Sequence, residues 1–303
     1  MPRNLCRKRV DQYSPLPSAT INHGDFAAEV SHLQITGCVQ GDFFVIPERS
    51  RYAVYENIEA FVHGGCLCDS RGGAYIPAMC GRFTYRLTWR EIYDLYRLTM
   101  PELPGRNLQA RYNICPTTTI EAVIQRDAKR ELVPMRWGLV PSWWKKKAKE
   151  TPATFNARAE TVADKPMFRS AFKRTRCLIP ASGYYEWHTT PSGKQPFYFT
   201  ARDGSPLTIA GLWDEWKDIE SGEPLKSCTM IITSANDFVS KLHDRMPVIL
   251  QPKDFEPWLT GKAGAELLTP AANDYLQTWP VSRKVNSSRA PDDDPTLIDP
   301  FAA

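Results

Sequence analysis

The chain has 303 residues and carries 38 Lys and Arg against 34 Asp and Glu, which gives a formal net charge of +4. Hydrophobic residues make up 42% of it and charged residues 24%, a composition that supports a folded core and excludes a wholly disordered or collagen-like chain. No apolar run approaches the ~20 residues needed to cross a bilayer, and the basic start lacks the apolar segment of a signal peptide. We therefore expect an intracellular protein without a membrane segment.

Residues 1–78 show neither sustained helical nor alternating periodicity, and they mix Gly, Ser and Pro with scattered aromatic residues. They hold seven Lys or Arg and eight Asp or Glu, against 31 and 26 in the remainder, so the net positive charge belongs to the second part of the chain. We expect residues 1–78 to be a poorly ordered N-terminal extension and residues 79–286 to form one domain.

The eight cysteines follow no spacing typical of a disulfide framework, so we expect reduced thiols. The nearest approach to a metal motif is Cys66 and Cys68 together with His63. A closed structural zinc site needs a second pair of ligands, which this cluster lacks. The sequence therefore predicts no metal site, and nothing in it requires an organic cofactor.

The pattern becomes regular after residue 79. Thr88–Leu98 begins with a residue that can cap a helix and places Ile92, Leu95 and Tyr96 on one helical face. Runs rich in β-branched or aromatic residues predict strands at Ile120–Arg126, Leu132–Val140, Pro196–Ala201, Leu207–Trp216 and Cys228–Ser234. Short helices are expected at Pro166–Lys173, Asp237–His243 and Lys253–Leu259.

Strands outnumber long helices in this pattern, and the connections between them look irregular. This favours a single α+β domain built round a curved, barrel-like antiparallel sheet with short peripheral helices. The residues after Asn286 include the run Pro291–Pro295 (PDDDP), which is typical of a solvated end. We expect residues 287–303 to be a mobile tail.

The segment Met79–Phe83 (MCGRF) places a cysteine directly after a methionine, the context in which an initiator methionine is removed. If translation or processing began at Met79, the mature chain would start with Cys80. An N-terminal cysteine has an α-amine with a pKa of about 7.7 to 8.0 and a thiol of about 8.5, so both are partly nucleophilic near neutrality. The amine would form a Schiff base with an aldehyde, and the thiolate would close a thiazolidine ring. The alternative is a small buried strand residue, and the sequence spacing leaves both open.

Further motifs follow Met79–Phe83 in a definite order: Arg111–Pro116, Arg136–Trp144, Phe155–Thr161, Cys177–Trp187 and His243–Pro247. The ordered set resembles the SOS-response-associated peptidase family, whose members are also called abasic-site processing proteins. The likeness runs from Met79 to about Val285 and is highly specific as a set, although each motif alone is weak. It implies a protein that senses abasic sites in single-stranded DNA and crosslinks to them through an N-terminal cysteine, here Cys80.

The resemblance also implies that an Asn, a Glu and a His surround the cysteine, and these fall on Asn156, Glu186 and His243. Opening a sugar hemiacetal and dehydrating a carbinolamine need a proton donor and acceptor beside the amine, and Glu186 is our choice for that role. Asn156 could hydrogen-bond the Cys80 backbone or amine, and His243 could orient or protonate the sugar oxygen. Taken singly, Glu186 would be interpreted as a surface strand carboxylate and His243 as a helix-end histidine.

Trp143 and Trp144 stand directly before four lysines at positions 145, 146, 147 and 149. Aromatic faces beside ammonium groups suit base stacking next to backbone neutralisation, as in single-strand binding, although a solvated basic loop is the alternative. Pro116 and Trp143 could wedge against the last stacked base.

Arg82, Arg158 and Arg245 each lie within a step or two of a proposed active residue, where guanidinium groups could clamp the phosphates that flank a missing base. The modest net charge predicts salt-sensitive binding driven by a local patch, without base readout.

Members of the family begin at the Met-Cys pair, whereas this chain carries residues 1–78 before Met79. An internal Cys80 has an amide in place of the amine, so the thiazolidine could not form. The upstream segment is then a miscalled reading frame, a propeptide cut after Met79, or the mark of a protein inactive in crosslinking. We favour the first explanation.

The sequence therefore predicts a monomer that binds single-stranded DNA and forms a covalent adduct with abasic sites in the DNA damage response, with no metal, membrane or organic cofactor involved. One alternative is a thiol peptidase that uses Cys80 with His243 and cleaves its own N-terminus or other peptides. The second alternative is a module that binds single-stranded DNA without a covalent step.

Overall fold

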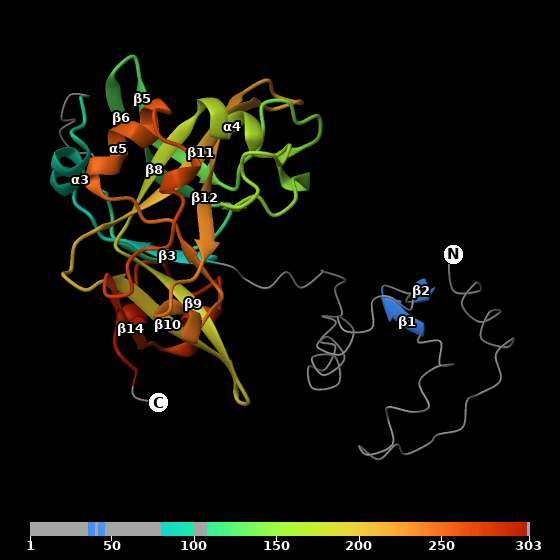
Figure 1. Ribbon diagram of the computed structural model, residues 1–303, viewed down its shortest axis with the longest axis vertical. Coiled ribbons are helices and arrows are strands. Elements are labelled where there is room, and N and C mark those ends of the chain that lie inside the picture. Colours follow the sequence, from blue (N-terminus) through green and yellow to red (C-terminus); the bar gives the residue numbers. More distant parts are fainter. Residues whose placement is uncertain (1–35, 40–41, 46–79, 100–107, 302–303) are drawn as a thin grey trace, which may run out of the picture. The chain divides into compact units, whose positions relative to one another are not determined.

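The computed structural model describes residues 36–39, 42–45, 80–99 and 108–301 (Figure 1). The chain divides into two units, Met1–Ile76 and Pro77–Ala303. The described part of the first unit is an antiparallel hairpin of β1 (Thr36–Val39) and β2 (Asp42–Val45), which the sequence analysis did not predict. The rest of the expected N-terminal extension, including Cys66, Cys68 and His63, lies outside the described residues.

The second unit contains a smaller sheet of five antiparallel strands in the order β14-β10-β9-β3-β4. These strands are β3 (Arg82–Tyr85), β4 (Arg111–Ile114), β9 (Gly183–Thr190), β10 (Gly193–Ala201) and β14 (Leu276–Pro280). In Figure 1 this sheet occupies the lower part of the unit, with β3 at its upper border.

The larger sheet has the order β11-β8-β5-β6-β12-β13, with β7 also paired to β12. Its strands are β5 (Thr119–Arg126), β6 (Lys129–Trp137), β7 (Asn156–Arg158), β8 (Arg176–Ala181), β11 (Leu207–Lys217), β12 (Pro224–Ser234) and β13 (Arg245–Pro247). Because β11 pairs with both β8 and β12, strands β11, β8, β5, β6 and β12 close into a ring. This confirms the α+β fold with a barrel-like sheet. The pairings of β12 with β6 and β7 are parallel, which we had not expected.

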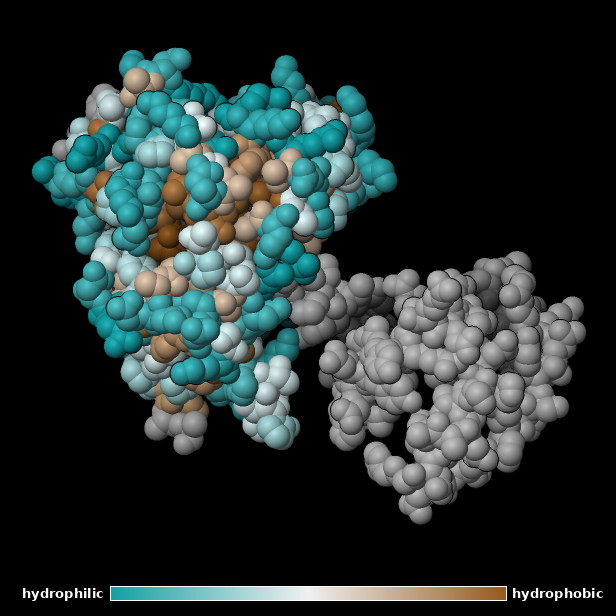
Figure 2. All heavy atoms as spheres, viewed as in Figure 1, coloured by the Kyte–Doolittle hydropathy of each residue, from teal (hydrophilic) through white to brown (hydrophobic). Residues whose placement is uncertain are grey.

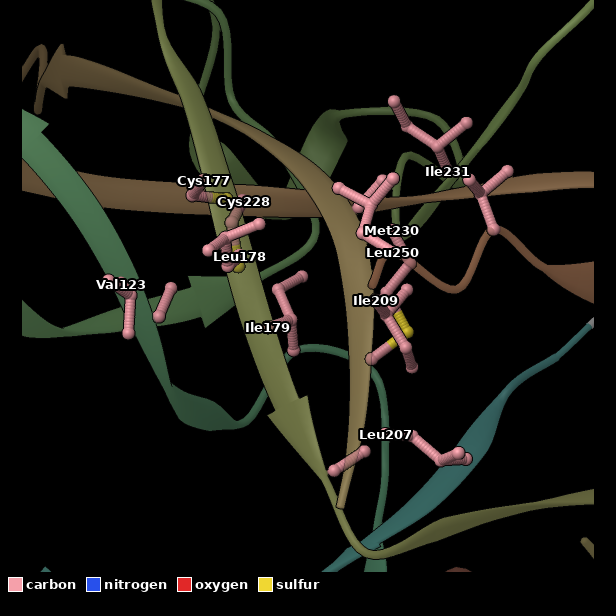
Figure 3. Packing of buried hydrophobic residues seen from close by; sticks show 14 of the residues in the cluster. Val123, Cys177, Leu178, Ile179, Leu207, Ile209, Cys228, Met230, Ile231 and Leu250 are labelled. Carbon is pink, nitrogen blue, oxygen red and sulfur yellow. The ribbon is translucent and has the colours of Figure 1, made fainter. Parts of the chain in front are cut away.

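Apolar side chains from β5, β8, β11 and β12 belong to one buried core cluster (Figure 3). The labelled residues of Figure 3 are all buried: Val123, Cys177, Leu178, Ile179, Leu207, Ile209, Cys228, Met230, Ile231 and Leu250. Packing is close at Gly211, where a Cβ would stand 2.8 Å from the Cys177 sulfur and 2.9 Å from Ile179 Cδ1. The glycine therefore lets β11 approach β8 without displacing the core.

Short helices lie round the sheets, as expected. They are α3 (Trp89–Tyr96), α4 (Arg169–Arg174) and α5 (Pro252–Thr260). The connecting segments contain the 3-10 turns η3 (Ala148–Glu150), η4 (Val239–Lys241), η5 (Ala265–Leu267), η6 (Arg283–Asn286) and η7 (Pro295–Ile298). Helix α3 begins with a capping box, in which Thr88 Oγ1 accepts from the Glu91 N–H and Glu91 Oε2 accepts from the Thr88 N–H. It ends at Arg97, whose φ of 51° is left-handed. None of the helices within the described ranges is long and apolar enough to cross a membrane.

Two predicted elements differ from the structure. The strand expected at Leu132–Val140 ends at Trp137, because Gly138 adopts a φ of +133° that a regular strand does not use. The helix expected at Asp237–His243 is only the 3-10 turn η4, Val239–Lys241. In the second unit, strands β3, β4, β7, β8, β9, β13 and β14 were not predicted as strands.

The mobile tail expected after Asn286 was wrong for residues 287–301. The Tyr112 N–H donates to the Asp292 carbonyl oxygen at 2.5 Å, and Arg111 Nε lies 2.6 Å from Asp292 Oδ2. Leu297 is fully buried, and the Trp279 indole donates to the carbonyl of Ile298. The acidic run suggested a solvated end, but the apolar residues that follow it anchor the segment on β4 and β14.

Hydrophilic residues cover most of the second unit on the face drawn in Figure 2, and a patch of apolar residues is visible near the middle of this face. Among the described residues, Trp143, Ile219 and Phe301 are the large apolar side chains with the highest exposure. A scattered set of this kind is ordinary for a globular surface, except where an exposed aromatic stands beside a run of cations, as Trp143 does.

Candidate functional site

Cys80 lies two residues before the start of strand β3 (Arg82–Tyr85). It is only 2% exposed. Its φ of 38° is unusual for a residue with a side chain. The backbone N–H of Cys80 donates to Glu186 Oε1 at 3.0 Å. The nitrogen that would become the amine of a chain starting at Cys80 is therefore in direct contact with a carboxyl group.

Glu186 lies in the middle of β9, which pairs with β3 in the register Phe83 with Tyr184 and Arg82 with Tyr185. The Glu186 side chain is fully buried, and this burial raises its pKa to about 8 by disfavouring the charged form. Hydrogen bonds from the Cys80 thiol and backbone oppose the rise, and the negative charge of Asp244 adds to it. A carboxyl group with a pKa near ambient pH can both give and take a proton.

Asn156 and His243 approach the same point from two other elements. Asn156 begins β7, and its Nδ2 donates to the Cys80 carbonyl oxygen at 3.4 Å. His243 follows η4, and its Nε2 lies 3.7 Å from Glu186 Oε2. His243 Nδ1 lies 3.1 Å from the Arg245 nitrogen and 3.2 Å from the Arg245 carbonyl oxygen, so it accepts from the first or donates to the second according to the tautomer, while Nε2 faces Glu186. Four residues predicted as catalytic, from separate parts of the chain, are thus brought together.

The thiol of Cys80 is held in its protonated form. Burial raises the pKa of the Cys80 thiol well above its ordinary value, and the negative charges of Glu186 and then Asp244 raise it further, while Arg245 lowers it. The thiol therefore needs a nearby group to take its proton before it can act as a nucleophile, and Glu186 is in position to do so.

Asp244 belongs to the site although the sequence analysis gave it no role. Its carboxylate is 83% exposed on the side chain and lies 3.5 Å from His243 Nδ1. It raises the pKa of both Glu186 and Cys80. Its place between His243 and Arg245 in the last motif was the available signal.

The arginines predicted to bind DNA lie in different settings. Arg158 is exposed at the end of β7, next to the proposed site. Arg245 lies 2.5 Å from Glu160 Oε1, with 19% of its side chain exposed. Both stand on the segments that supply Asn156 and His243.

Arg82 is engaged inside the protein. Its guanidinium donates to Asn113 Oδ1 at 2.8 Å and to the carbonyl of Val285, and it lies 5.8 Å from the ring centre of Trp187. Asn113 in turn donates to the carbonyl of Ser287 at 3.2 Å. The guanidinium thus joins the C-terminal segment to β3, which a prediction from neighbouring residues had no means to show.

The aromatic candidates form a separate group. Trp143 is 43% exposed, and its ring centre lies 6.0 Å from that of Trp144, which is half-buried. The Trp144 indole donates to the Lys147 carbonyl, which fixes the start of the basic loop. Pro116 is half-buried in the turn after β4.

The family model of the SOS response associated peptidases matches residues 79–288, and the chain belongs to this family. Among its relatives, the abasic site processing protein YoaM of Bacillus subtilis is 36% identical over 217 residues, which cover 70% of this chain and 94% of YoaM. The abasic site processing protein YedK of Escherichia coli is 30% identical over 223 residues, covering 69% of this chain and 95% of YedK. The abasic site processing protein HMCES of Gallus gallus is 36% identical over 208 residues, covering 59% and 61%.

The fold recurs in solved structures. A crystal structure of a protein from Bacteroides thetaiotaomicron has a TM-score of 0.66 and 24% identity, and covers 74% of this chain and 100% of its own. One from Bordetella bronchiseptica has a TM-score of 0.57 and 28% identity, and covers 67% and 100%.

Proposed function

We propose that this chain, once it begins at Cys80, binds single-stranded DNA and forms a covalent thiazolidine adduct with abasic sites. The observation that carries the proposal is the 3.0 Å contact between the Cys80 nitrogen and the buried carboxyl of Glu186. Relatives that carry the name abasic site processing protein support the substrate class.

The first half of the reaction needs an acid beside the amine. With a pKa raised to about 8, Glu186 is largely protonated at neutral pH and can protonate the ring oxygen while it takes back the proton of the anomeric hydroxyl, which opens the sugar to its aldehyde. The free amine of Cys80 then adds to the aldehyde carbon, and Glu186 gives its proton to the carbinolamine hydroxyl, which departs as water and leaves an iminium ion. In the tautomer with its proton on Nε2, His243, which faces Glu186, is placed to supply a second hydrogen bond to the departing oxygen.

The second half needs a base for the thiol. Glu186, now a carboxylate, takes the Cys80 thiol proton; the sulfur bonds to the iminium carbon, and the π electrons of the C=N bond return to nitrogen. Asn156 Nδ2 donates to the Cys80 carbonyl oxygen and so helps to hold the Cys80 backbone beside Glu186. Each step is reversible through the same groups, so Glu186 also serves release.

Single-strand binding rests on the exposed Trp143 and the basic loop that follows it. Stacking on an aromatic face needs no particular base, and the lysines at positions 145, 146 and 149 neutralise backbone phosphates, whereas Lys147 pairs with Glu220 at 2.7 Å. Arg158 and Arg245 stand beside the site and suit the phosphates on either side of the abasic sugar. We propose Pro116 as a wedge against the last stacked base. We also propose that the protein acts as a monomer inside the cell.

The free amine requires that residues 1–79 be absent from the active protein. The family match begins at Met79, which supports a mature N-terminus at Cys80. Intact-mass measurement of the protein expressed from its own locus tests this: a species that starts at Cys80 is expected, and a stable full-length chain as the sole product contradicts it.

The adduct is tested with a uracil-containing oligonucleotide after base removal. Protein that begins at Cys80 is expected to give a DNA-linked band on a denaturing gel, and Cys80→Ala is expected to abolish it. Cys115→Ala is the matched control, because Cys115 is a half-buried thiol that makes no contact with Glu186. A band that persists in Cys80→Ala, or none with the parent protein, refutes the proposal.

The two other functions are outcomes of the same experiment. A non-covalent module would shift DNA on native gels only. A thiol peptidase would cleave peptides without a free amine, but the raised pKa of the Cys80 thiol and the orientation of His243 toward Glu186 count against a thiolate of the kind that such enzymes use.

A further inference from the structure

The residues on either side of the exposed Trp143 are anchored by side chains of one strand. The Ser142 N–H donates to Asp214 Oδ2 at 2.9 Å, and the Trp144 carbonyl oxygen accepts from the Trp216 indole N–H at 2.8 Å. Asp214 and Trp216 both lie on β11. Trp143 stands between these two anchor points and is 43% exposed. The backbone is therefore fixed on both sides of an exposed ring.

The anchoring side chains share one face of the hairpin formed by β11 and β12. Asp214 and Trp216 are two residues apart in a strand, so they point to the same side of the sheet. Asp214 pairs with Ser227 of β12, and Ser227 Oγ accepts from the Val140 N–H at 2.8 Å. Trp216 and Ser227 are buried, and a buried polar group is costly unless it is paired. The backbone of residues 140–144 supplies the partners of all three side chains.

Trp144 transmits this anchoring to the ring of Trp143. The Trp144 N–H donates to the Pro141 carbonyl at 2.9 Å, and its indole donates to the Lys147 carbonyl at 3.2 Å. The ring centres of Trp143 and Trp144 lie 6.0 Å apart with 61° between the planes, an edge arrangement that aromatic pairs favour. The half-buried Trp144 ring therefore supports the exposed one.

A fixed orientation matters for a ring that stacks on a base. A ring in a mobile loop would lose conformational freedom on stacking, and this loss would weaken binding. Lys147 Nζ lies 2.7 Å from Glu220 Oε1 near the tip of the same hairpin, but both side chains are exposed, so this ion pair contributes little. The orientation of Trp143 therefore depends chiefly on Asp214 and Trp216.

We propose that Asp214 and Trp216 are positioning residues that hold Trp143 ready to stack on a base of single-stranded DNA. They act through the backbone of Ser142 and Trp144, and the ring is ordered before DNA arrives. The consequence for DNA rests on the proposed function, whereas the anchoring of residues 142–144 is a property of the chain by itself.

The anchoring is tested in the full chain with Trp216→Phe and with Trp258→Phe as its matched control. Trp258 on α5 is also buried, and its indole donates to the Cys177 carbonyl at 3.0 Å, so each variant loses one indole hydrogen bond to a backbone carbonyl. Trypsin cleavage after the lysines at positions 145, 146, 147 and 149 is followed by mass spectrometry under native conditions. We expect it to be about fivefold faster in Trp216→Phe and unchanged in Trp258→Phe. A parent rate in Trp216→Phe, or equal acceleration in both variants, overturns the proposal.

DNA binding is measured with an oligothymidylate that has no abasic site, in protein that begins at Cys80. Trp216→Phe is expected to raise the Kd about fivefold and Trp258→Phe to leave it unchanged, while adduct formation at saturating abasic DNA keeps the parent rate in both. In a Trp143→Ala background, which lacks the ring, Trp216→Phe should weaken binding no further. An unchanged Kd in Trp216→Phe, or a further loss in the Trp143→Ala background, contradicts positioning of Trp143.

Asp214→Ala is a second variant that leaves the buried rings intact. Its control is Asp203→Ala, because Asp203 Oδ1 accepts from the Ser205 N–H at 2.9 Å in the turn after β10. Each variant loses a negative charge, which by itself would strengthen DNA binding. We expect Asp214→Ala to raise the Kd about threefold and Asp203→Ala not to raise it. Unchanged or stronger binding in Asp214→Ala refutes its role. If the parent protein binds no single-stranded DNA, the proposed function fails, but trypsin cleavage still decides the anchoring.

Discussion

The two faces of strand β9 differ in whether their polar side-chain atoms have hydrogen-bond partners. On one face, the Tyr185 hydroxyl donates to the Tyr112 carbonyl at 2.7 Å and the Trp187 indole donates to Asn286 Oδ1 at 2.7 Å. On the other, the Tyr184 hydroxyl and Glu186 Oε2 have no hydrogen-bond partner in the ranges that the structure describes. The first face is satisfied by the fold itself. The second face carries polar groups without such partners, and one of them, Glu186, contacts Cys80. Buried polar groups that the fold leaves unpaired are expected at functional sites.

The satisfied face also explains how the site is held. Arg82 and Asn113 bind carbonyls of the segment that follows Val285, and this segment thereby ties β3 and β4 to the back of β9. Cys80 precedes β3 and Glu186 lies on β9, so the contact between them is fixed from behind by polar bonds that take no part in the reaction. Supporting hydrogen bonds of this kind keep the reacting groups of a site in a precise arrangement.

The largest expected effect comes from removing the acid on the unpaired face. Glu186→Gln keeps the shape of the side chain and a hydrogen-bond acceptor for the Cys80 nitrogen but cannot transfer a proton. General acid and base catalysis contributes typically 10²- to 10⁴-fold, so we expect adduct formation to slow at least ~100-fold, and release of a preformed adduct to slow as well. Single-turnover kinetics on a denaturing gel measure both. Glu215→Gln, an exposed carboxylate on β11, is the control, and parent rates in Glu186→Gln would remove Glu186 from the mechanism.

The same carboxyl group predicts a pH dependence of stability. The pKa of Glu186 rises from 4.5 to about 8 on folding, so between these values the folded chain holds a proton that the unfolded chain has released. The contribution of Glu186 to the free energy of unfolding is therefore highest below about pH 4.5. It falls by on the order of a few kcal/mol as the pH rises to 8. Urea denaturation between pH 5 and 8 measures the slope. Glu186→Gln should flatten it, and an equal slope in parent and variant contradicts the raised pKa.

On the satisfied face, Arg82 gives the next largest effect. Arg82→Ala leaves Asn113 Oδ1 and the Val285 carbonyl without their donor, and we expect the free energy of unfolding to drop by roughly 2 to 3 kcal/mol. Arg158→Ala, at an exposed position, should change stability by less than about 0.5 kcal/mol and should weaken DNA binding and its salt dependence instead. Urea denaturation and binding titrations separate the two. If Arg82→Ala weakens binding at unchanged stability, Arg82 belongs with the phosphate clamps.

Local patterns in the sequence predicted the parts of the fold that local forces decide. The Thr88 cap, the buried face of α3 and the long strands β5, β10, β11 and β12 were visible as capping and hydrophobic patterns. Strands β3, β7 and β9 carry the site, and their glycines, charges and short lengths obscured the strand pattern. β3 and β7 pair with segments far along the chain, which no local window contains, whereas β9 was missed although it forms a hairpin with the adjacent strand β10.

For the site, the sequence predicted which residues take part but not how they are arranged. Cys80, Asn156, Glu186 and His243 were found because each lies in a motif whose order is characteristic of the family. The motifs gave no distances, so the burial of Glu186 and the contact with the Cys80 nitrogen needed the structure. Arg82 was predicted to bind DNA from its nearness to Cys80 in sequence, and that nearness could not show that its guanidinium also binds Asn113 and carbonyls more than 200 residues further along the chain. Nearness in sequence says little about which way a strand residue faces.

The smallest expected effect compares the two faces with the least change to the molecule. Tyr185→Phe removes a hydroxyl group that has a partner, and we expect it to cost about 1 kcal/mol of unfolding free energy, because the Tyr112 carbonyl is left without its donor. Tyr184→Phe removes an unpaired one and should leave the free energy of unfolding equal or slightly higher. Urea denaturation at one pH resolves this difference, and the two proteins differ only in which neighbouring ring has lost its oxygen. A loss in Tyr184→Phe as large as in Tyr185→Phe would mean that the phenol already has a partner in the folded protein, and the distinction between the two faces would then rest on Glu186 alone.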